Sequence, residues 1–195
     1  MSTEIFKKAA IRNAVSCIRG DRRFPHQVFV GDWGDYLFFY PDVLFESGFI
    51  EVKSLLLKEE SASTIAVVNL GNTGNETEEE PRAIYLDRDT TANEYVAELM
   101  GDGSPDSWMF LMDRYVLASD KGHWSIYCEK ENDVAVLAIG EALSGSTRSQ
   151  LAKLLGATPV GSVLTPGTGR LFDFQSLVPE WKSALMAEYG PSGSS

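Results

Sequence analysis

Hydrophobic residues recur at helical spacing in three stretches of the chain. The first covers residues 3–19 and stops at Gly20. Another runs up to Gly156, and the last begins at Pro179, a favoured residue in the first turn of a helix. We therefore expect a helix in each stretch. Their apolar positions are Phe6, Ala10, Ala14 and Cys17 in the first, Leu151, Leu154 and Leu155 in the second, and Trp181, Leu185 and Tyr189 in the third.

A further helix is predicted by its capping sequence. Thr91 and Glu94 have the spacing of a capping box, in which each side chain accepts a hydrogen bond from a backbone N–H at the helix start. An apolar face follows, and Gly101 ends the pattern. The residues of this face are Tyr95, Val96, Leu99 and Met100.

Short apolar and aromatic runs between turn residues predict strands. Residues 27–30, 36–40 and 49–52 are rich in aromatic and β-branched side chains and are separated by glycines. The continuous apolar run at residues 64–70 suits a central strand, and residues 83–86 add a shorter one. The first half of the chain is therefore expected to supply several strands of one sheet.

The clearest strand pattern lies between residues 114 and 139. Three apolar runs, at residues 114–119, 124–129 and 134–139, are joined by short turns, which predicts an antiparallel meander. Gly122 is placed for the left-handed conformation of a tight hairpin. In the middle run apolar and more polar residues alternate, so we expect one of its faces to be more fully buried than the other.

These elements predict an α+β fold, with a mainly antiparallel sheet of about six strands flanked by helices. The length of 195 residues and the hydrophobic content of 44% suit one sizeable core, so we expect a single domain over residues 1–189. Residues 71–81 are the most polar and turn-rich stretch and are expected to form an exposed acidic loop. Residues 190–195 lack core-forming side chains and are expected to be a flexible tail.

The charge balance narrows the class of ligand. There are 28 Asp and Glu against 17 Lys and Arg, so the formal net charge is −11 at pH 7. Such a surface repels nucleic acid and anionic membranes, and it attracts basic proteins. Cys17 and Cys128 have no metal-ligand or redox spacing, and no run approaches the roughly 18 apolar residues of a membrane span. We expect a cytoplasmic protein without a metal or cofactor.

Two acidic segments are candidate contact surfaces for a basic partner. The predicted acidic loop carries Glu76, Glu78, Glu79 and Glu80. A glycine-flanked turn places aromatic side chains among carboxylates, with Asp32, Trp33, Asp35 and Tyr36. Two alternatives remain open, in which the loop is only a solvated segment and Trp33 is a core aromatic next to a tight turn.

Asp42, Glu51 and Lys53 follow the pattern of the PD-(D/E)xK nucleases. In that chemistry two carboxylates hold a divalent metal and the lysine polarises the attacking water. If residues 47–48 form a hairpin turn, Glu51 and Lys53 share a strand face, as a nuclease requires. The competing interpretation is that both side chains are solvated on a strand whose other face is buried. The acidic net charge also suits DNA poorly.

Three other patterns each lack an essential part. Residues 87–91 resemble the DxDxT motif of haloacid-dehalogenase-like phosphatases, but the downstream acidic pair for magnesium is missing, and a helix start explains them. Residues 140–147 have the glycine and threonine spacing of a P-loop, with Ser146 in place of the lysine. His26 and His123, the two histidines, lie in no catalytic motif.

The meander also carries a resemblance to a protein class. Residues 114–139, RYVLASDKGHWSIYCEKENDVAVLAI, are similar to the C-terminal sheet of small bacterial immunity-type proteins of polymorphic toxin systems. The resemblance implies a cytoplasmic protein that binds and neutralises a cognate toxin domain. The matching positions are Trp124, Ile126, Tyr127, Glu129, Asp133 and residues 134–139.

We therefore expect an immunity-type binding protein, not an enzyme, that covers a basic toxin domain by charge complementarity. Two alternatives stay open, a metal-dependent nuclease using Asp42, Glu51 and Lys53, and an acidic adaptor or chaperone for a basic protein. The nuclease has a geometric requirement, because both carboxylates must reach one Mg²⁺ at about 2.1 Å with the lysine alongside.

Overall fold

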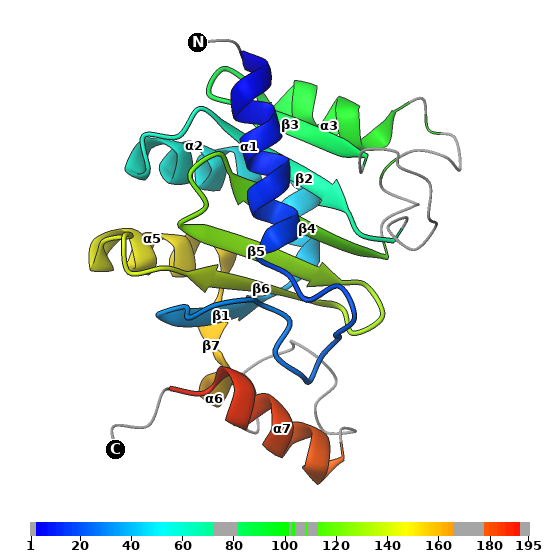
Figure 1. The fold of residues 1–195 in the computed structure, drawn as a ribbon, viewed down its shortest axis with the longest axis vertical. Coiled ribbons are helices and arrows are strands. Elements are labelled where there is room, and N and C mark those ends of the chain that lie inside the picture. Colours follow the sequence, from blue (N-terminus) through cyan, green and yellow to red (C-terminus); the bar gives the residue numbers. More distant parts are fainter. Residues whose placement is uncertain are drawn as a thin grey trace.

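The computed structural model describes residues 3–71, 82–101, 103, 108, 113–165 and 178–191. Within these residues seven strands form one sheet in the order β3-β2-β4-β5-β6-β1-β7, and all neighbours are antiparallel (Figure 1). The predicted α+β fold is confirmed, with one strand more than the six expected. The strands are β1 (Asp35–Phe39), β2 (Thr64–Asn69), β3 (Ala83–Asp87), β4 (Arg114–Ser119), β5 (Trp124–Glu129), β6 (Val134–Ile139) and β7 (Thr158–Pro159).

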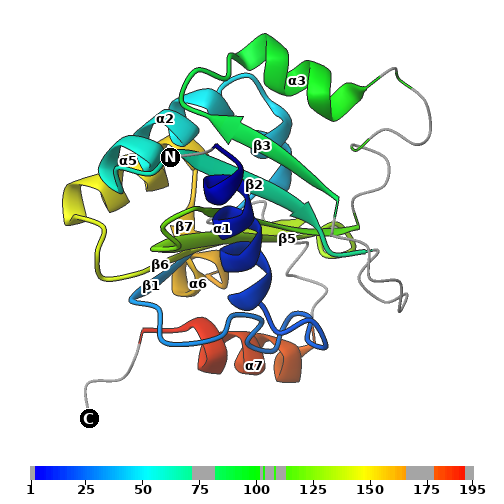
Figure 2. The ribbon, with the colours of Figure 1, turned by 45° about the horizontal axis from the view of Figure 1, so that its top comes forward.

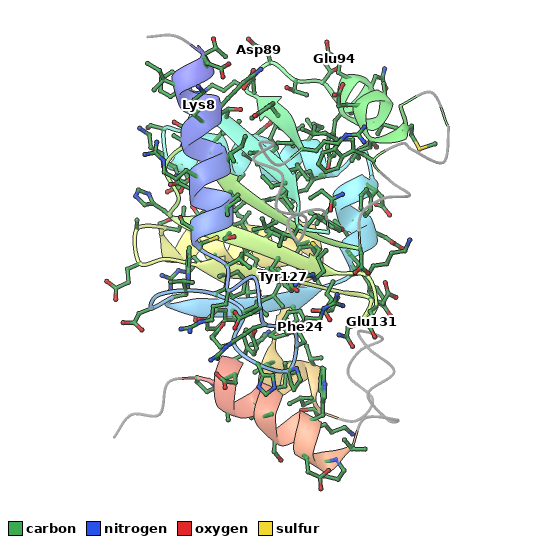
Figure 3. The ribbon with its side chains drawn as sticks, turned by 45° about the vertical axis from the view of Figure 1, so that its right-hand side comes forward. Lys8, Phe24, Asp89, Glu94, Tyr127 and Glu131 are labelled. Carbon is green, nitrogen blue, oxygen red and sulfur yellow. The ribbon has the colours of Figure 1, made fainter. Side chains whose placement is uncertain are left out.

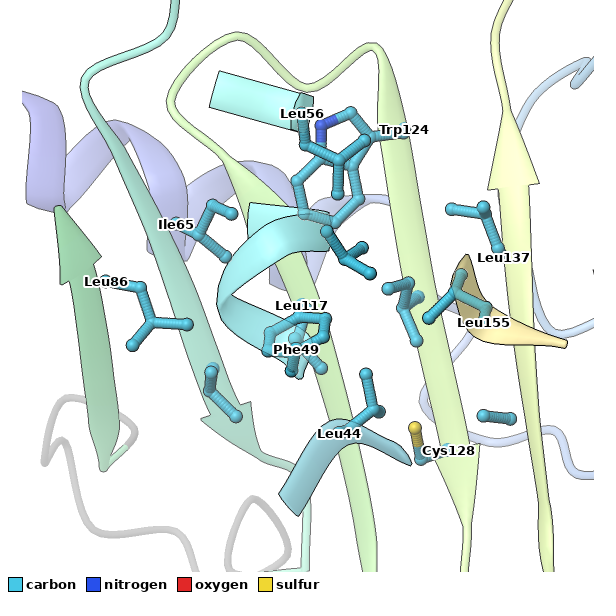
Figure 4. Packing of buried hydrophobic residues seen from close by; sticks show 14 of the residues in the cluster. Leu44, Phe49, Leu56, Ile65, Leu86, Leu117, Trp124, Cys128, Leu137 and Leu155 are labelled. Atoms are coloured by element: carbon cyan, nitrogen blue, oxygen red, sulfur yellow. The ribbon is translucent and has the colours of Figure 1, made fainter. Parts of the chain in front are cut away.

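Helices cover both faces of the sheet, which gives three layers (Figure 2). One face packs against α1 (Thr3–Ser16), α6 (Val160–Val163) and α7 (Pro179–Tyr189). The other packs against the 3-10 helix η1 (Pro41–Phe45) and against α2 (Phe49–Glu59), α3 (Ala92–Met100) and α5 (Gly145–Leu155). Figure 4 shows the second of these cores, where Leu44, Phe49, Leu56 and Leu155 meet strand residues such as Leu117 and Trp124.

The meander of β4, β5 and β6 forms as predicted. β4 pairs with β5 and β5 with β6 in simple antiparallel register, and Gly122 has a φ of 74° in the first turn. A Cβ at Gly122 would lie 2.9 Å from the side-chain nitrogen of Asn13, so the glycine also makes room for α1.

The expectation that β5 buries one face more fully is wrong. All six residues of β5 are buried, as are all six of β2 and of β6. Ser125 and Tyr127 point to the α1 side of the sheet, where helices and the segment after α1 exclude water. Strands that are covered on both faces consist mostly of apolar residues without alternation. The weak alternation of polarity in β5 therefore does not predict how deeply each face is buried.

Two of the three strands predicted between residues 27 and 52 are absent. Residues 36–40 do supply β1, but residues 27–30 form only one bridge, between Phe29 and Ile18. Residues 49–52 are the first turn of α2, not a strand. Four residues are too few to show a helical period. Over the full length of α2 the buried positions recur at helical spacing, at Phe49, Val52, Lys53, Leu56 and Leu57.

The predicted helix ends are largely confirmed. Thr91 and Glu94 form both hydrogen bonds of the capping box at α3, and Pro179 stands in the first turn of α7. Gly156 takes the left-handed conformation after α5. The first helix is shorter than expected and ends at Ser16. The predicted acidic loop from residue 72 onward and residues 192–195 of the predicted tail lie outside the described residues.

Candidate functional site

Most side chains of the predicted contact turn at residues 32–36 form contacts within the protein. The indole nitrogen of Trp33 donates to the backbone oxygen of Val30 at 3.0 Å, and its ring packs against Phe29. The carboxylate of Asp35 forms an ion pair with Arg148 at 2.7 Å. Trp33 is therefore half-buried and packed within its own turn, and the charge of Asp35 is compensated by Arg148.

The remaining residues of that surface differ in exposure. Tyr36 is half-buried, its hydroxyl accepts a hydrogen bond from Gln27, and burial raises its pKa. Asp32 is exposed. The other predicted contact surface, with Glu76, Glu78, Glu79 and Glu80, lies outside the described residues.

The nuclease pattern does not assemble into a site. Glu51 and Lys53 lie two positions apart on α2, where Glu51 is exposed and Lys53 is buried, so the expectation of a shared strand face is wrong. Asp42 lies in η1 and is exposed. Throughout the described part of the chain, no three His, Cys, Asp or Glu side chains are placed to hold a metal ion together.

Lys53 has a structural task in the turn that follows β3. Its ammonium donates to the backbone oxygens of Asp87, Arg88 and Thr90 at 2.9, 3.0 and 2.8 Å. Burial lowers the pKa of Lys53, and the nearby carboxylates of Asp89, Asp87 and Glu94 oppose that shift. All three protons of the ammonium are used by the turn, which fixes the path of the chain between β3 and α3.

The phosphatase-like and P-loop-like patterns are helix starts. The backbone nitrogen of Asp87 donates to the hydroxyl of Thr90, and Thr91 caps α3. In the P-loop-like segment Ser144 caps α5 by accepting a hydrogen bond from the backbone nitrogen of Thr147. Hydroxyl capping accounts for the threonines and serines of both patterns.

One group of residues has the composition of a catalytic triad but not its geometry. Oε2 of Glu60 accepts a hydrogen bond from the Ser119 hydroxyl, and Oε1 accepts one from the backbone nitrogen of His123. Nδ1 of the His123 ring lies 3.6 Å from Oε1. In a triad the imidazole stands between the acid and the hydroxyl, whereas here the carboxylate stands between them. Ser119 is also fully buried, so the group ties α2 to the β4–β5 turn.

A concave feature formed by described residues lies at the β3 end of the sheet. A hollow of about 480 Å³ is lined by residues 83–87 of β3, by Lys7 of α1, and by Asp89, Thr90, Glu94, Tyr95 and Glu98 of the following turn and α3. We call it the acidic hollow, because Asp87, Asp89, Glu94 and Glu98 bring four carboxylates to it and Lys7 brings the one cation of its described lining. Figure 3 shows Asp89 and Glu94 at the same end of the molecule as the start of α1.

The carboxylates of the acidic hollow are held in different ways. Glu94 accepts hydrogen bonds at 2.8 Å from the backbone nitrogen and from the hydroxyl of Thr91, which lower its pKa and keep it ionised. Glu98 lies one turn further along α3, so both point to the same side of the helix. Within the described part of the chain, Oδ1 of Asp87 is buried and accepts no hydrogen bond.

The acidic hollow was missed at the sequence level as a contact surface. The local pattern around Asp87 and Asp89 indicates a phosphatase motif or a helix start, and that around Glu94 indicates a helix cap. A signal is present in the sequence, because residues 87–98 carry four carboxylates against one basic residue, Arg88. Lys7 and Tyr85 could not have been assigned to the same place, since they come from elements far apart in the sequence.

Comparison with protein-family models, with curated proteins and with solved structures gives no match for this chain. Among the described helices, none has both the length and the apolar character that crossing a membrane requires. The site therefore has to be interpreted from its own geometry.

Proposed function

We propose that this protein acts by binding a basic protein partner at the acidic hollow. The observation that carries the proposal is the concentration of four carboxylates against one lysine around a hollow of about 480 Å³. The net charge of −11 adds long-range attraction, which accelerates the encounter with a cationic partner, while the local carboxylates select the orientation. No cofactor is needed for such a role.

The partner class that we propose is a toxin domain, which the protein neutralises in the bacterial cytoplasm. This part rests on the resemblance of residues 114–139 to immunity-type proteins. Charge supports it, because toxin domains that act on nucleic acid need basic surfaces to approach phosphates, and an acidic protein competes for those surfaces.

The placement of the residues favours the acidic hollow over the turn at residues 32–36 as the contact surface. Asp35 is already paired with Arg148, and Trp33 uses its indole N–H within its own turn. At the acidic hollow, Asp89, Glu94 and Glu98 are exposed. An exposed carboxylate beside a concave surface can pair with an incoming lysine or arginine without first breaking an internal ion pair.

The test is co-expression of this chain with the product of the gene immediately upstream, scoring complex formation and rescue of growth. The double variant D89N/E98Q removes two charges from the acidic hollow. The matched control D32N/E141Q removes two exposed charges beside β1 and β6, which lie toward the end of the sheet opposite to β3. We expect D89N/E98Q to weaken the complex by about tenfold or more, and D32N/E141Q by less than about twofold.

The outcomes separate the parts of the proposal. No complex and no rescue would count against the toxin as partner. Equal weakening by the two double variants would show that the net charge, and not the acidic hollow, governs binding. Stronger weakening by D32N/E141Q would move the contact surface to the predicted turn.

A further inference from the structure

Lys7 belongs to α1, which packs on the face of the sheet opposite to α3, and it still lines the acidic hollow beside the edge strand β3. The residues of α1 that face the sheet are Ala10 and Ala14, which are fully buried, and Lys7 stands one turn before them on the same side. The next residue, Lys8, lies about 100° further around the helix and is exposed. Lys7 lines the acidic hollow and Lys8 does not.

The ammonium of Lys7 lies over an aromatic ring. Its Nζ is 4.7 Å from the centre of the Tyr85 ring, which is the geometry of a cation–π contact. The groups that line the acidic hollow around it are the carboxylates of Asp87, Asp89, Glu94 and Glu98. Within the described residues Lys7 has no ion pair at 4.0 Å or less, so its ammonium contacts the Tyr85 ring and not a carboxylate.

Such a place has the chemistry of a lysine-binding subsite. An aromatic face and surrounding carboxylates together attract an ammonium group. The buried Oδ1 of Asp87, which accepts no hydrogen bond in the described part of the chain, adds an acceptor in the same lining. The structure already contains an ammonium there, and it comes from the protein's own first helix.

We propose, on the basis of the proposed function, that Lys7 is an internal ligand of the acidic hollow and occupies the place over Tyr85 that a lysine side chain of the partner takes. Two ammonium groups repel each other, so the partner's lysine binds as Lys7 leaves the ring. Lys7 has a long, flexible side chain on an exposed helix end, and it can turn into solvent without disturbing the core. Lys7 therefore lowers the affinity of the acidic hollow for basic ligands.

The experiment compares two variants with the same change in net charge. A fluorescein-labelled hexalysine peptide is titrated with the wild-type protein, K7M and K8M at low ionic strength, and binding is followed by fluorescence anisotropy. Long-range attraction changes equally in both variants, so a difference between them reports the local effect of Lys7. We expect K7M to bind hexalysine about five- to tenfold tighter than K8M does.

Addition of D89N/E98Q to K7M locates the effect. We expect the gain in affinity to disappear, since the protein then lacks two of the carboxylates that attract the peptide to the acidic hollow. Equal affinities of K7M and K8M overturn the inference about Lys7 and leave the proposed function standing, provided that the wild-type protein binds the peptide. A gain that persists with D89N/E98Q also overturns it, because the peptide then binds elsewhere. Absence of binding to all variants overturns the proposed function and this inference together.

Discussion

The carboxylate of Glu60 accepts a hydrogen bond from the indole N–H of Trp124 at 2.7 Å, although 64 positions separate the two residues. The side chain of Glu60 is fully buried, and burial raises its pKa. The Ser119 hydroxyl and the backbone nitrogen of His123 also donate to it. One carboxylate at the end of α2 thus satisfies three donors of the β4–β5 turn.

We predict that E60A lowers the free energy of unfolding by about 3 kcal/mol, because it leaves buried donors without an acceptor. The neighbouring Glu59 is exposed, and E59A should change stability by less than about 0.5 kcal/mol. Urea denaturation of both variants checks this. Similar midpoints for E60A and E59A would show that water replaces the carboxylate without cost.

Lys53 provides a second test of the internal polar contacts. We predict that K53M destabilises the protein by about 2 kcal/mol, since three backbone oxygens lose their donor while the buried charge is removed. Amide hydrogen exchange should quicken first at residues 87–91, which the ammonium holds. Lys58 is exposed on the same helix, so K58M is the control. An unchanged exchange rate in K53M would contradict the role given to Lys53.

Tyr189 should hold α7 to the segment after α1. Its hydroxyl donates to the backbone oxygen of His26 at 2.7 Å and accepts from the backbone nitrogen of Val28 at 2.9 Å. We expect Y189F to cost about 1.5 kcal/mol and to increase proteolytic cleavage around α7. The exposed Ser183 on the same helix gives the control S183A. Equal cleavage rates in the two variants would exclude this role.

Both thiols should react slowly in the native protein. Burial raises the pKa of Cys17 to about 11, and it raises the pKa of the fully buried Cys128 further. The thiolate is the reactive form, so a raised pKa means a smaller reactive fraction at pH 8. With Ellman's reagent we expect labelling of Cys17 to accelerate as the pH rises toward 11, and both thiols to react at once in guanidinium chloride. The variant C17S assigns the signal, and rapid labelling of the native protein at pH 8 would contradict the prediction.

Local sequence signals were sufficient wherever one element decides its own structure. The capping box of Thr91 and Glu94, the proline at the start of α7 and the turn at Gly122 depend on contacts within a few residues. The three runs of the meander were recognised because apolar strands joined by short turns pair with their neighbours in sequence. The α+β class followed from these elements.

Tertiary structure decided the conformation of residues 49–52 and the contacts of Asp35, Lys53 and Lys7. A strand was predicted there because four residues are too few to separate the two periods, and packing of the whole of α2 on the sheet selected the helix. Asp35 forms an ion pair with Arg148, and Lys53 donates hydrogen bonds to the turn after β3. No local sequence pattern predicts either contact. The sequence by itself determined an acidic α+β protein. The contact of Lys7 with Tyr85 beside the carboxylates of α3 required the tertiary structure, because packing on the sheet brings α1 next to β3 and α3, which lie about 80 residues further along the chain.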